Sequence, residues 1–269
     1  MSRVRLVGCV LLLSLSSASY GVKPADPLAE WNFDEGRGAV ARDQVSGKDS
    51  GALHGPAWIK RGDGFALELD GLDDHFKADH PEISGPVALE FWIKPTGLSY
   101  GEPHLVGRSM SSFTFTYYPH HEKVNWYVGQ GGNHVRGHVK LAQWNHVVGT
   151  WDGEHIGLWI NGKRVDYRKT KEKTYEPATF IAVGTDGRPE LPDYKGAIDD
   201  IRLYAHVPPD DEIRARFWQR AVEYGYDARW LERVKVTGYE YFQRRQVVVE
   251  ADYRLLPPLA EDARIEVEL

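Results

Sequence analysis

Residues 142–165, AQWNHVVGTWDGEHIGLWINGKRV, alternate between apolar side chains and polar or small ones with the period of two that is typical of β-strands. The middle run places Trp159 on one face and three aliphatic side chains on the other, those of Ile156, Leu158 and Ile160. Asp152-Gly153 and Asn161-Gly162 separate the runs, and such pairs tolerate the positive φ angles of tight hairpin turns. The segment therefore predicts a three-stranded β-meander. Large apolar groups on both faces place its middle strand inside a two-layer structure.

Similar short alternating segments fill most of the chain, among them FALELDG, VALEFWIKP, FTFTYYP, KVNWYVG and GAIDDIRLYAH, bounded by Gly, Pro, Asp or His. About twelve strands at near-regular spacing predict an all-β protein, an antiparallel two-sheet β-sandwich or jelly roll. One short C-terminal helix is expected over about 208–225, with Asp210 as N-cap. Its apolar stripe consists of Ile213, Phe217, Ala221 and Tyr224.

The ends of the chain differ from its middle. Arginines precede an apolar run from Leu6 to Leu15 that is too short to span a bilayer, and small residues follow, so residues 1–18 are expected to be a secretory signal peptide. A lipoprotein box ending at Cys9 is the alternative. Residues 19–225 are expected to form the jelly-roll domain with its closing helix. Residues 226–269 predict a β-hairpin tail from QVVVEADYRL and ARIEVEL, either docked on the sandwich or belonging to an absent module.

Composition narrows the class of partner. A net charge of −6 gives no electrostatic case for nucleic acid or an anionic membrane. Removal of the signal takes away Cys9, the only cysteine, so the exported fold would rest on its core or on a metal. No Asn-x-Ser/Thr sequon occurs, which favours a bacterial source. We expect a monomer that is secreted, periplasmic or at the cell surface, without a transmembrane segment.

Seven segments occur in an order that resembles laminin-G-like jelly-roll domains of the concanavalin A-like lectin and glucanase superfamily: WNFDEGRG, DQVSG, FALELDGLDDHF, LEFWIKP, WNHVVGTWDG, LWINGKRV and GAIDDIRLYAHVPPDDEI. The resemblance covers roughly residues 29–218. It implies two curved antiparallel sheets with the first and last strands adjacent, and ligands on the concave face or the rim loops. It does not imply one function, because this sandwich hosts lectins, adhesion modules and glycosidases.

The sequence contains no recognised motif of a glycosidase or of a serine or cysteine hydrolase. Glucanases of this fold carry Glu-x-Asp-x-Glu on one strand, whereas Glu68-Leu69-Asp70-Gly71-Leu72 lacks the third carboxylate. No Gly-x-Ser-x-Gly elbow occurs, and the mature chain would have no thiol. We therefore expect a non-catalytic protein, with an unrecognised pair of carboxylates as the alternative.

A sugar site needs an exposed aromatic ring with polar groups around it. Trp126, Tyr118 and Trp159 are the candidate ligand-binding residues, although aromatic residues of a sandwich belong more often to the core. Trp31, Trp92 and Trp144 are interpreted as packing residues.

Metal sites are the last candidates. Asp34, Asp43 and Asp199 are candidate ligands of a structural calcium ion, which would join the first strand to the last. Ile198 and Ile201 both suit burial, which requires a β-bulge at Asp199-Asp200, where a cation or basic partner would relieve the repulsion of the carboxylates. The alternative is that the carboxylates of Asp199 and Asp200 are hydrated and bonded only to loop amides, without a cation. A zinc site at His134 and His138 is weaker, because no third ligand has suitable spacing.

These observations favour a secreted, non-catalytic recognition module that binds a polysaccharide or other glycan, or an extracellular protein. The alternatives are a structural or adhesion module of a larger exported enzyme and, less favoured, a glycoside hydrolase.

Overall fold

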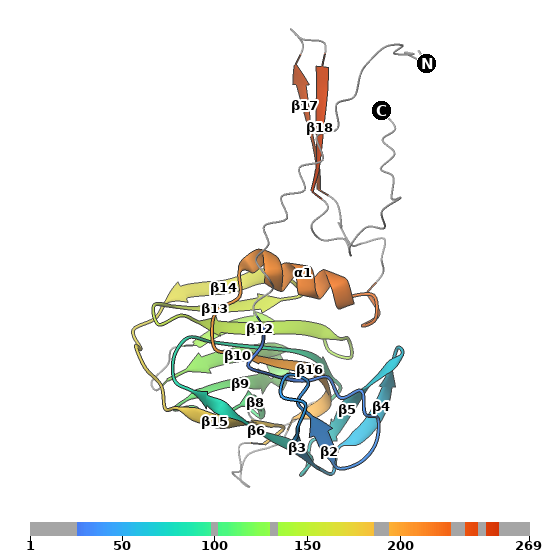
Figure 1. Ribbon diagram of the computed structural model, residues 1–269, viewed down its shortest axis with the longest axis vertical. Coiled ribbons are helices and arrows are strands. Elements are labelled where there is room, and N and C mark those ends of the chain that lie inside the picture. Colours follow the sequence, from blue (N-terminus) through green and yellow to red (C-terminus); the bar gives the residue numbers. More distant parts are fainter. Residues whose placement is uncertain are drawn as a thin grey trace.

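A computed structural model describes residues 26–97, 102–129, 134–185, 194–226, 235–241 and 246–252. The expected signal peptide, its Cys9 alternative and the last segment, ARIEVEL, lie outside these residues. The described residues between 26 and 226 fold into two antiparallel sheets that face each other, with one α-helix outside them (Figure 1). The predicted all-β sandwich with a short C-terminal helix is confirmed.

The first sheet contains eight strands and carries the meander at one end. Its order is β14 (Lys163–Lys169), β13 (His155–Ile160), β12 (Asn145–Trp151), β7 (Val87–Pro95), β16 (Lys195–Tyr204), β5 (Gly64–Asp70) and β4 (Ala57–Arg61). The eighth strand, β1 (Ala29–Trp31), pairs with the end of β16, so the first and last strands of the sandwich are adjacent as expected.

The second sheet also contains eight strands. Its order is β11 (His134–His138), β10 (Lys123–Val128), β9 (Phe113–Tyr118), β8 (His104–Gly107), β15 (Ala178–Val183), β6 (His75–Ile83), β3 (Asp49–His54) and β2 (Val40–Arg42). A short 3₁₀ turn, η1 (Pro119–His121), connects β9 to β10.

The core lies between the sheets, and one glycine fixes how closely they approach. Trp126 of the second sheet is fully buried, and its indole N–H donates to the carbonyl of Thr150 at 3.1 Å. The ring lies over Gly149 of β12, where an added Cβ would come within 2.5 Å of the indole. Gly149 therefore makes room for an aromatic side chain that reaches across from the opposite sheet.

The outer face of the first sheet is covered by α1 (Asp210–Arg220) and the turn that follows it (Figure 1). Ile213 packs on Val148 and Trp159, and Phe217 stacks on Trp92. Ile213 and Phe217 confirm the first half of the expected stripe, and they explain why β13 is apolar on both faces. The helix ends at Arg220 rather than near 225, so Ala221 and Tyr224 are buried as expected but lie in the turn that follows it. The N-cap is Pro209 rather than Asp210, because the residue before the first helical turn has extended backbone angles.

A β-bulge interrupts β16, as the spacing of Ile198 and Ile201 predicts. The register with β7 shifts between Asp199 and Arg202, and Asp200 adopts a positive φ of 48°. Ile198 and Ile201 both point into the core. The bulge leaves the side chains of Asp199 and Asp200 buried on the helix side, near Tyr224.

The tail contains a hairpin of β17 (Lys235–Tyr241) and β18 (Gln246–Asp252), which pair with each other in a separate two-stranded sheet (Figure 1). The strand predicted at QVVVEAD is confirmed. Its partner is the preceding segment, reached across only residues 242–245, because a short connection brings neighbouring segments together at the lowest entropic cost.

Candidate functional site

The outer face of the second sheet carries polar side chains where β9, β10 and β11 meet. In β10, Val124, Trp126 and Val128 point into the core, so Lys123, Asn125 and Tyr127 point outward. Asn125 pairs with Thr116 of β9 on one side and with Arg136 of β11 on the other. Three neighbouring strands thus present a continuous polar row, and α1 lies on the other sheet.

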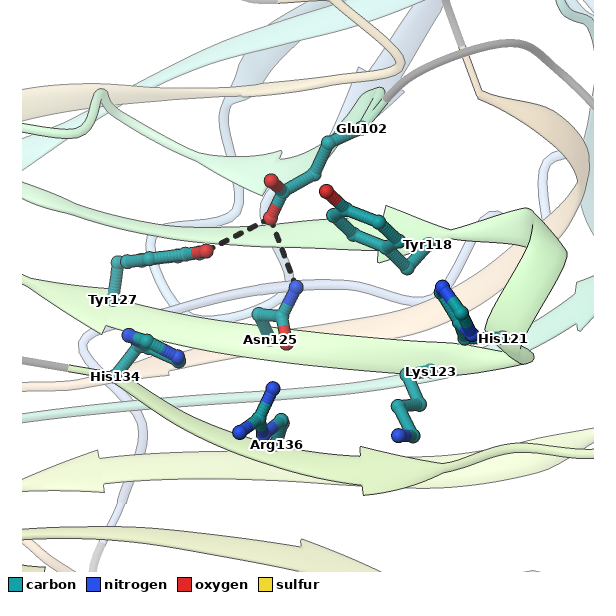
Figure 2. A pocket seen from close by; sticks show the side chains of 8 residues that line it. All are labelled: Glu102, Tyr118, His121, Lys123, Asn125, Tyr127, His134 and Arg136. Carbon is teal, nitrogen blue, oxygen red and sulfur yellow. Dashed lines mark hydrogen bonds between the residues drawn. The ribbon is translucent and has the colours of Figure 1, made fainter. Parts of the chain in front are cut away.

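A pocket of about 410 Å³ opens over this row. Figure 2 shows its eight lining side chains: Glu102, Tyr118, His121, Lys123, Asn125, Tyr127, His134 and Arg136. Asn125 is buried at its floor, whereas Tyr118 and Arg136 are exposed at its rim. The pocket combines aromatic rings, an amide, a carboxylate and cations, which is a set of groups suited to a polar ligand.

Glu102 organises one side of the pocket. Its Oε1 accepts bonds from the Asn125 amide at 2.8 Å and the Tyr127 hydroxyl at 2.9 Å (Figure 2). It accepts a third bond from the Thr116 hydroxyl. Burial and the bond to Glu102 raise the pKa of Tyr127 well above its ordinary range, so its hydroxyl stays protonated and donates. These bonds fix the side chains of the floor before any ligand arrives.

Two tyrosine–histidine pairs form the walls. The Tyr118 and His121 rings have centroids 5.7 Å apart, and those of Tyr127 and His134 lie 4.9 Å apart. Tyr118 is 37% exposed, so a ring face remains open to solvent. Such a face covers apolar C–H groups of a bound molecule while the hydroxyl stays hydrated.

The structure separates the three aromatic residues that the sequence suggested for ligand binding. Tyr118 lines the pocket, as expected of a ligand-facing ring. Trp126 is 0% exposed in the core, and Trp159 is 2% exposed beneath α1. The expectation that either tryptophan presents a ring to a ligand is therefore wrong, because the opposite sheet covers one and the helix covers the other.

Sequence reasoning did not identify the side chains around Tyr118 as a ligand-binding pocket, although the alternation pattern of one strand points to part of it. Asn125 and Tyr127 alternate with Trp126, and the more polar of the two alternating sets faces outward. Glu102 lies before β8 in a segment without periodicity, and Arg136 reaches the site only through its pairing with Asn125.

The expected calcium ligands do not form an ion site. Asp199 accepts a bond from Nε of Arg61 at 2.6 Å, and Asp34 lies 3.7 Å from the same guanidinium. Asp43 does not join them and accepts backbone N–H groups of Glu30, Val45 and Ser46. Burial opposes ionisation of Asp43, but the Ser46 hydroxyl and these backbone bonds outweigh it and lower its pKa. A basic partner thus occupies the position predicted for the ion, and these residues do not fit calcium.

Around Arg61 the charges neutralise one another. Its Nη1 also lies 3.1 Å from Glu223, and Glu223 pairs with Arg220 at 3.0 Å. A second hollow of about 340 Å³ lies beside these side chains, between the β4–β5 hairpin and the end of α1. Because both of its cations, Arg61 and Arg220, are already paired with carboxylates, we interpret this hollow as part of the contact that holds the helix.

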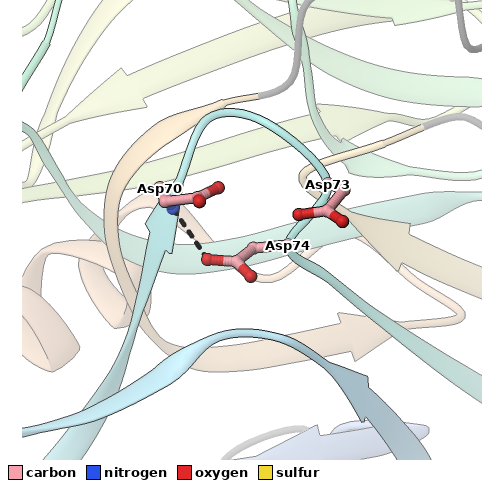
Figure 3. Close-up of side chains that lie close together, drawn as sticks. All are labelled: Asp70, Asp73 and Asp74. Atoms are coloured by element: carbon pink, nitrogen blue, oxygen red, sulfur yellow. Dashed lines mark hydrogen bonds between the residues drawn. The ribbon is translucent and has the colours of Figure 1, made fainter.

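Other potential metal ligands gather in two places. His134 and His138 lie on one face of β11, as predicted, with the buried Val135 on the opposite face. Asp70, Asp73 and Asp74 meet in the turn between β5 and β6, with carboxylate oxygens within 4.8 Å of one another (Figure 3). Asp74 accepts the backbone N–H of Asp70 at 2.9 Å, and burial together with the neighbouring aspartates raises its pKa.

Comparison of the sequence with protein families matches residues 70–214, more than half of the chain, to a laminin-G domain described as "Concanavalin A-like lectin/glucanases superfamily". The chain belongs to this superfamily. The jelly-roll topology, with β1 beside β16, is that of the family suggested by the seven sequence segments.

Several solved structures have a similar sandwich fold at low sequence identity. Domain 4 of an extracellular arabinanase from Geobacillus stearothermophilus, solved in complex with arabinotriose, has a TM-score of 0.57 and 17% identity, covering 71% of this chain and 98% of that domain. The binding domain of botulinum neurotoxin serotype G has a TM-score of 0.60 and 11% identity, covering 73% of this chain and 51% of that one.

A sialidase from Trypanosoma rangeli, in complex with sialic acid, has a TM-score of 0.58 and 12% identity, covering 74% of this chain and 33% of that one. The chain thus spans a whole arabinanase domain but only about half of the toxin domain and a third of the sialidase. No curated protein sequence matches it. Within the described part of the chain, the helix is too short and too polar to cross a bilayer.

Proposed function

We propose that the protein is a secreted, non-catalytic module that binds a glycan in the pocket of β9, β10 and β11. The observation that carries this proposal is the combination of the open Tyr118 ring with the fixed polar floor of Asn125 and Glu102. Sugar rings present both an apolar C–H face and hydroxyl groups, so they match both parts of the pocket.

The non-catalytic role is supported by the composition of the pocket. Glu102 is the one carboxylate among its described lining residues, whereas glycoside hydrolysis ordinarily uses two, about 5–10 Å apart. Glu102 already accepts three bonds through Oε1, which favours a binding role over proton transfer. The arabinanase domain, which spans nearly the same fold and was solved with arabinotriose, is consistent with a sugar-binding accessory domain.

A glycan array with the wild-type protein and two variants tests the proposal. Tyr118→Ala removes the open ring; covering a ring that is about one-third exposed contributes roughly 1 kcal/mol, so binding should weaken about fivefold. Asn125→Ala removes a floor donor and should weaken binding by a similar factor. Tyr167→Ala is the control, because this tyrosine is 44% exposed but lies on β14 of the other sheet.

Three outcomes are distinct. Glycan binding that the pocket variants weaken and Tyr167→Ala does not would support the proposal. Binding that is insensitive to both pocket variants would place the ligand elsewhere. A folded protein that binds no glycan would favour the alternative, a structural or adhesion module of a larger exported enzyme.

A further inference from the structure

The pocket has an uneven distribution of charge. Lys123 on β10 and Arg136 on β11 supply two fixed positive charges, and Glu102 supplies the one negative charge among the described lining residues. Figure 2 shows Glu102 on the opposite side of the pocket from Lys123 and Arg136. A bound molecule would therefore meet a carboxylate at one end and two cations at the other.

The two cations are available to a ligand. Neither the Lys123 ammonium nor the Arg136 guanidinium forms an ion pair with the described residues, although the backbone N–H of Arg136 donates to Asp166. This differs from Arg61, Arg202 and Arg216, whose guanidinium groups are all paired with carboxylates. Lys123 is half-buried and Arg136 is exposed, so both cations are accessible to an anionic ligand, to which they can donate charge-assisted hydrogen bonds.

The register places both cations within reach of one small ligand. Arg136 is directly opposite Asn125, and Lys123 lies two residues before Asn125 on the same face of β10. Opposite side chains of a sheet have Cβ atoms about 5 Å apart and diagonal ones about 7–8 Å apart, so a group above Asn125 can contact both cations.

The charge of the pocket also differs from that of the whole protein. The chain has a net charge of −6, so its average field repels anions. An uncharged ligand would need no fixed cations, and their presence at this site favours selection for an anion.

We infer that the pocket selects an acidic sugar, whose carboxylate or sulfate lies between Arg136 and Lys123. Its ring covers Tyr118, and its hydroxyl groups bond to Asn125 and the second carboxylate oxygen of Glu102. This inference rests on the proposed glycan-binding function and adds the class of ligand.

Matched pairs of acidic and neutral oligosaccharides test this inference by calorimetry. Trigalacturonate is compared with its methyl ester, and a sulfated galactan oligosaccharide with its desulfated form. At least one acidic member should bind about tenfold or more tightly than its neutral counterpart, a difference of about 1.4 kcal/mol, because hydrogen bonds between charged groups are stronger than those between neutral ones. The two pairs distinguish a carboxylate from a sulfate.

Arg136→Gln and Lys123→Gln should each reduce the preference for the acidic member. Arg214→Gln, which removes an exposed cation on α1, should leave it unchanged. The inference is overturned if acidic and neutral members bind equally, or if the preference survives both pocket variants. If acidic and neutral oligosaccharides bind equally and Tyr118→Ala weakens both, the proposed glycan pocket stands and only the preference for an acidic sugar is wrong. If binding depends on neither Tyr118 nor Asn125, both the proposed function and this inference are wrong.

Discussion

Substituting Glu90 by Gln should destabilise the sandwich more than any change of an exposed carboxylate. Glu90 lies on β7 beneath α1, fully buried. Its Oε2 accepts a bond from Nε of Arg216 at 2.8 Å, and its Oε1 lies 2.8 Å from Nε2 of His146. The Tyr204 hydroxyl donates to Oε2 at 3.2 Å, and Arg202 lies 3.7 Å away. One carboxylate thus connects the helix to three strands.

The cost follows from the cations that the substitution leaves behind. Removing one partner of a buried ion pair costs about 3–5 kcal/mol, because the other charge stays desolvated. Arg216 and Arg202 keep a little contact with solvent, so about 3 kcal/mol is the appropriate estimate. For a domain of this size about 1 kcal/mol lowers the melting temperature by about 2–4 °C, so Glu90→Gln should lower it by about 6–12 °C.

Differential scanning calorimetry at pH 7 measures this shift, with Glu154→Gln, an exposed carboxylate of the β12–β13 turn, as the control. Burial opposes ionisation of Glu90, but Arg216, His146 and Arg202 outweigh it and hold its pKa far below the ordinary value. Its stabilisation is therefore present at neutral pH and lost under strong acid, where the wild type and the variant should converge. A shift below 2 °C at pH 7 would refute this account of the Glu90 contacts.

Three further predictions concern the buried bulge, calcium and export. Burial and the neighbouring Asp200 raise the pKa of Asp199 to about 8 against the opposing effect of Arg61, so the folded protein binds a proton there that the unfolded chain has released. Wild-type stability in urea should consequently fall as pH rises from about 4 to 8, and Asp199→Asn should flatten this fall; equal slopes would contradict it. Because Arg61 already pairs with Asp199, calcium should not bind this carboxylate. The difference in melting temperature between millimolar calcium and chelator should therefore be the same in wild type and Asp199→Asn. A stabilisation by calcium that Asp199→Asn abolishes would instead make Asp199 a calcium ligand. Intact-mass analysis of exported protein should show the loss of about 18 residues, and retention of Arg3 or a lipid on Cys9 would contradict a cleaved signal peptide.

The geometry around Tyr224 also bears on the proton bound at Asp199. The Tyr224 hydroxyl lies 2.8 Å from Asp199 and 2.6 Å from Asp200, yet it has one hydrogen to donate. Two carboxylates thus compete for one hydrogen, and a proton on Asp199 relieves this competition. This agrees with the raised pKa of Asp199.

Much of the fold was predictable because alternation and turn chemistry act locally. Asn161-Gly162 and Gly153 adopt the positive φ angles that their hairpins need. The spacing of Ile198 and Ile201 was sufficient to predict the bulge, since two inward residues three apart cannot occur in a regular strand.

The site was harder to predict because alternation defines two faces without saying which is buried. Trp126 and Tyr127 are adjacent aromatic residues on opposite faces of β10, and the space for Trp126 depends on Gly149 of the other sheet. The Arg61–Asp199 contact joins residues 138 positions apart, so the sequence indicated the need for a neutralising partner but not its identity.

The central claim, a glycan pocket on the outer face of the second sheet, is tested most directly by an NMR titration of the ¹⁵N-labelled protein with the best-bound oligosaccharide of the array. The predicted result is that amide shifts concentrate at Asn125, Tyr127 and Arg136 and follow one saturation curve. Shifts confined to α1 or to the β4–β5 hairpin, with β10 and β11 unchanged, would contradict the claim.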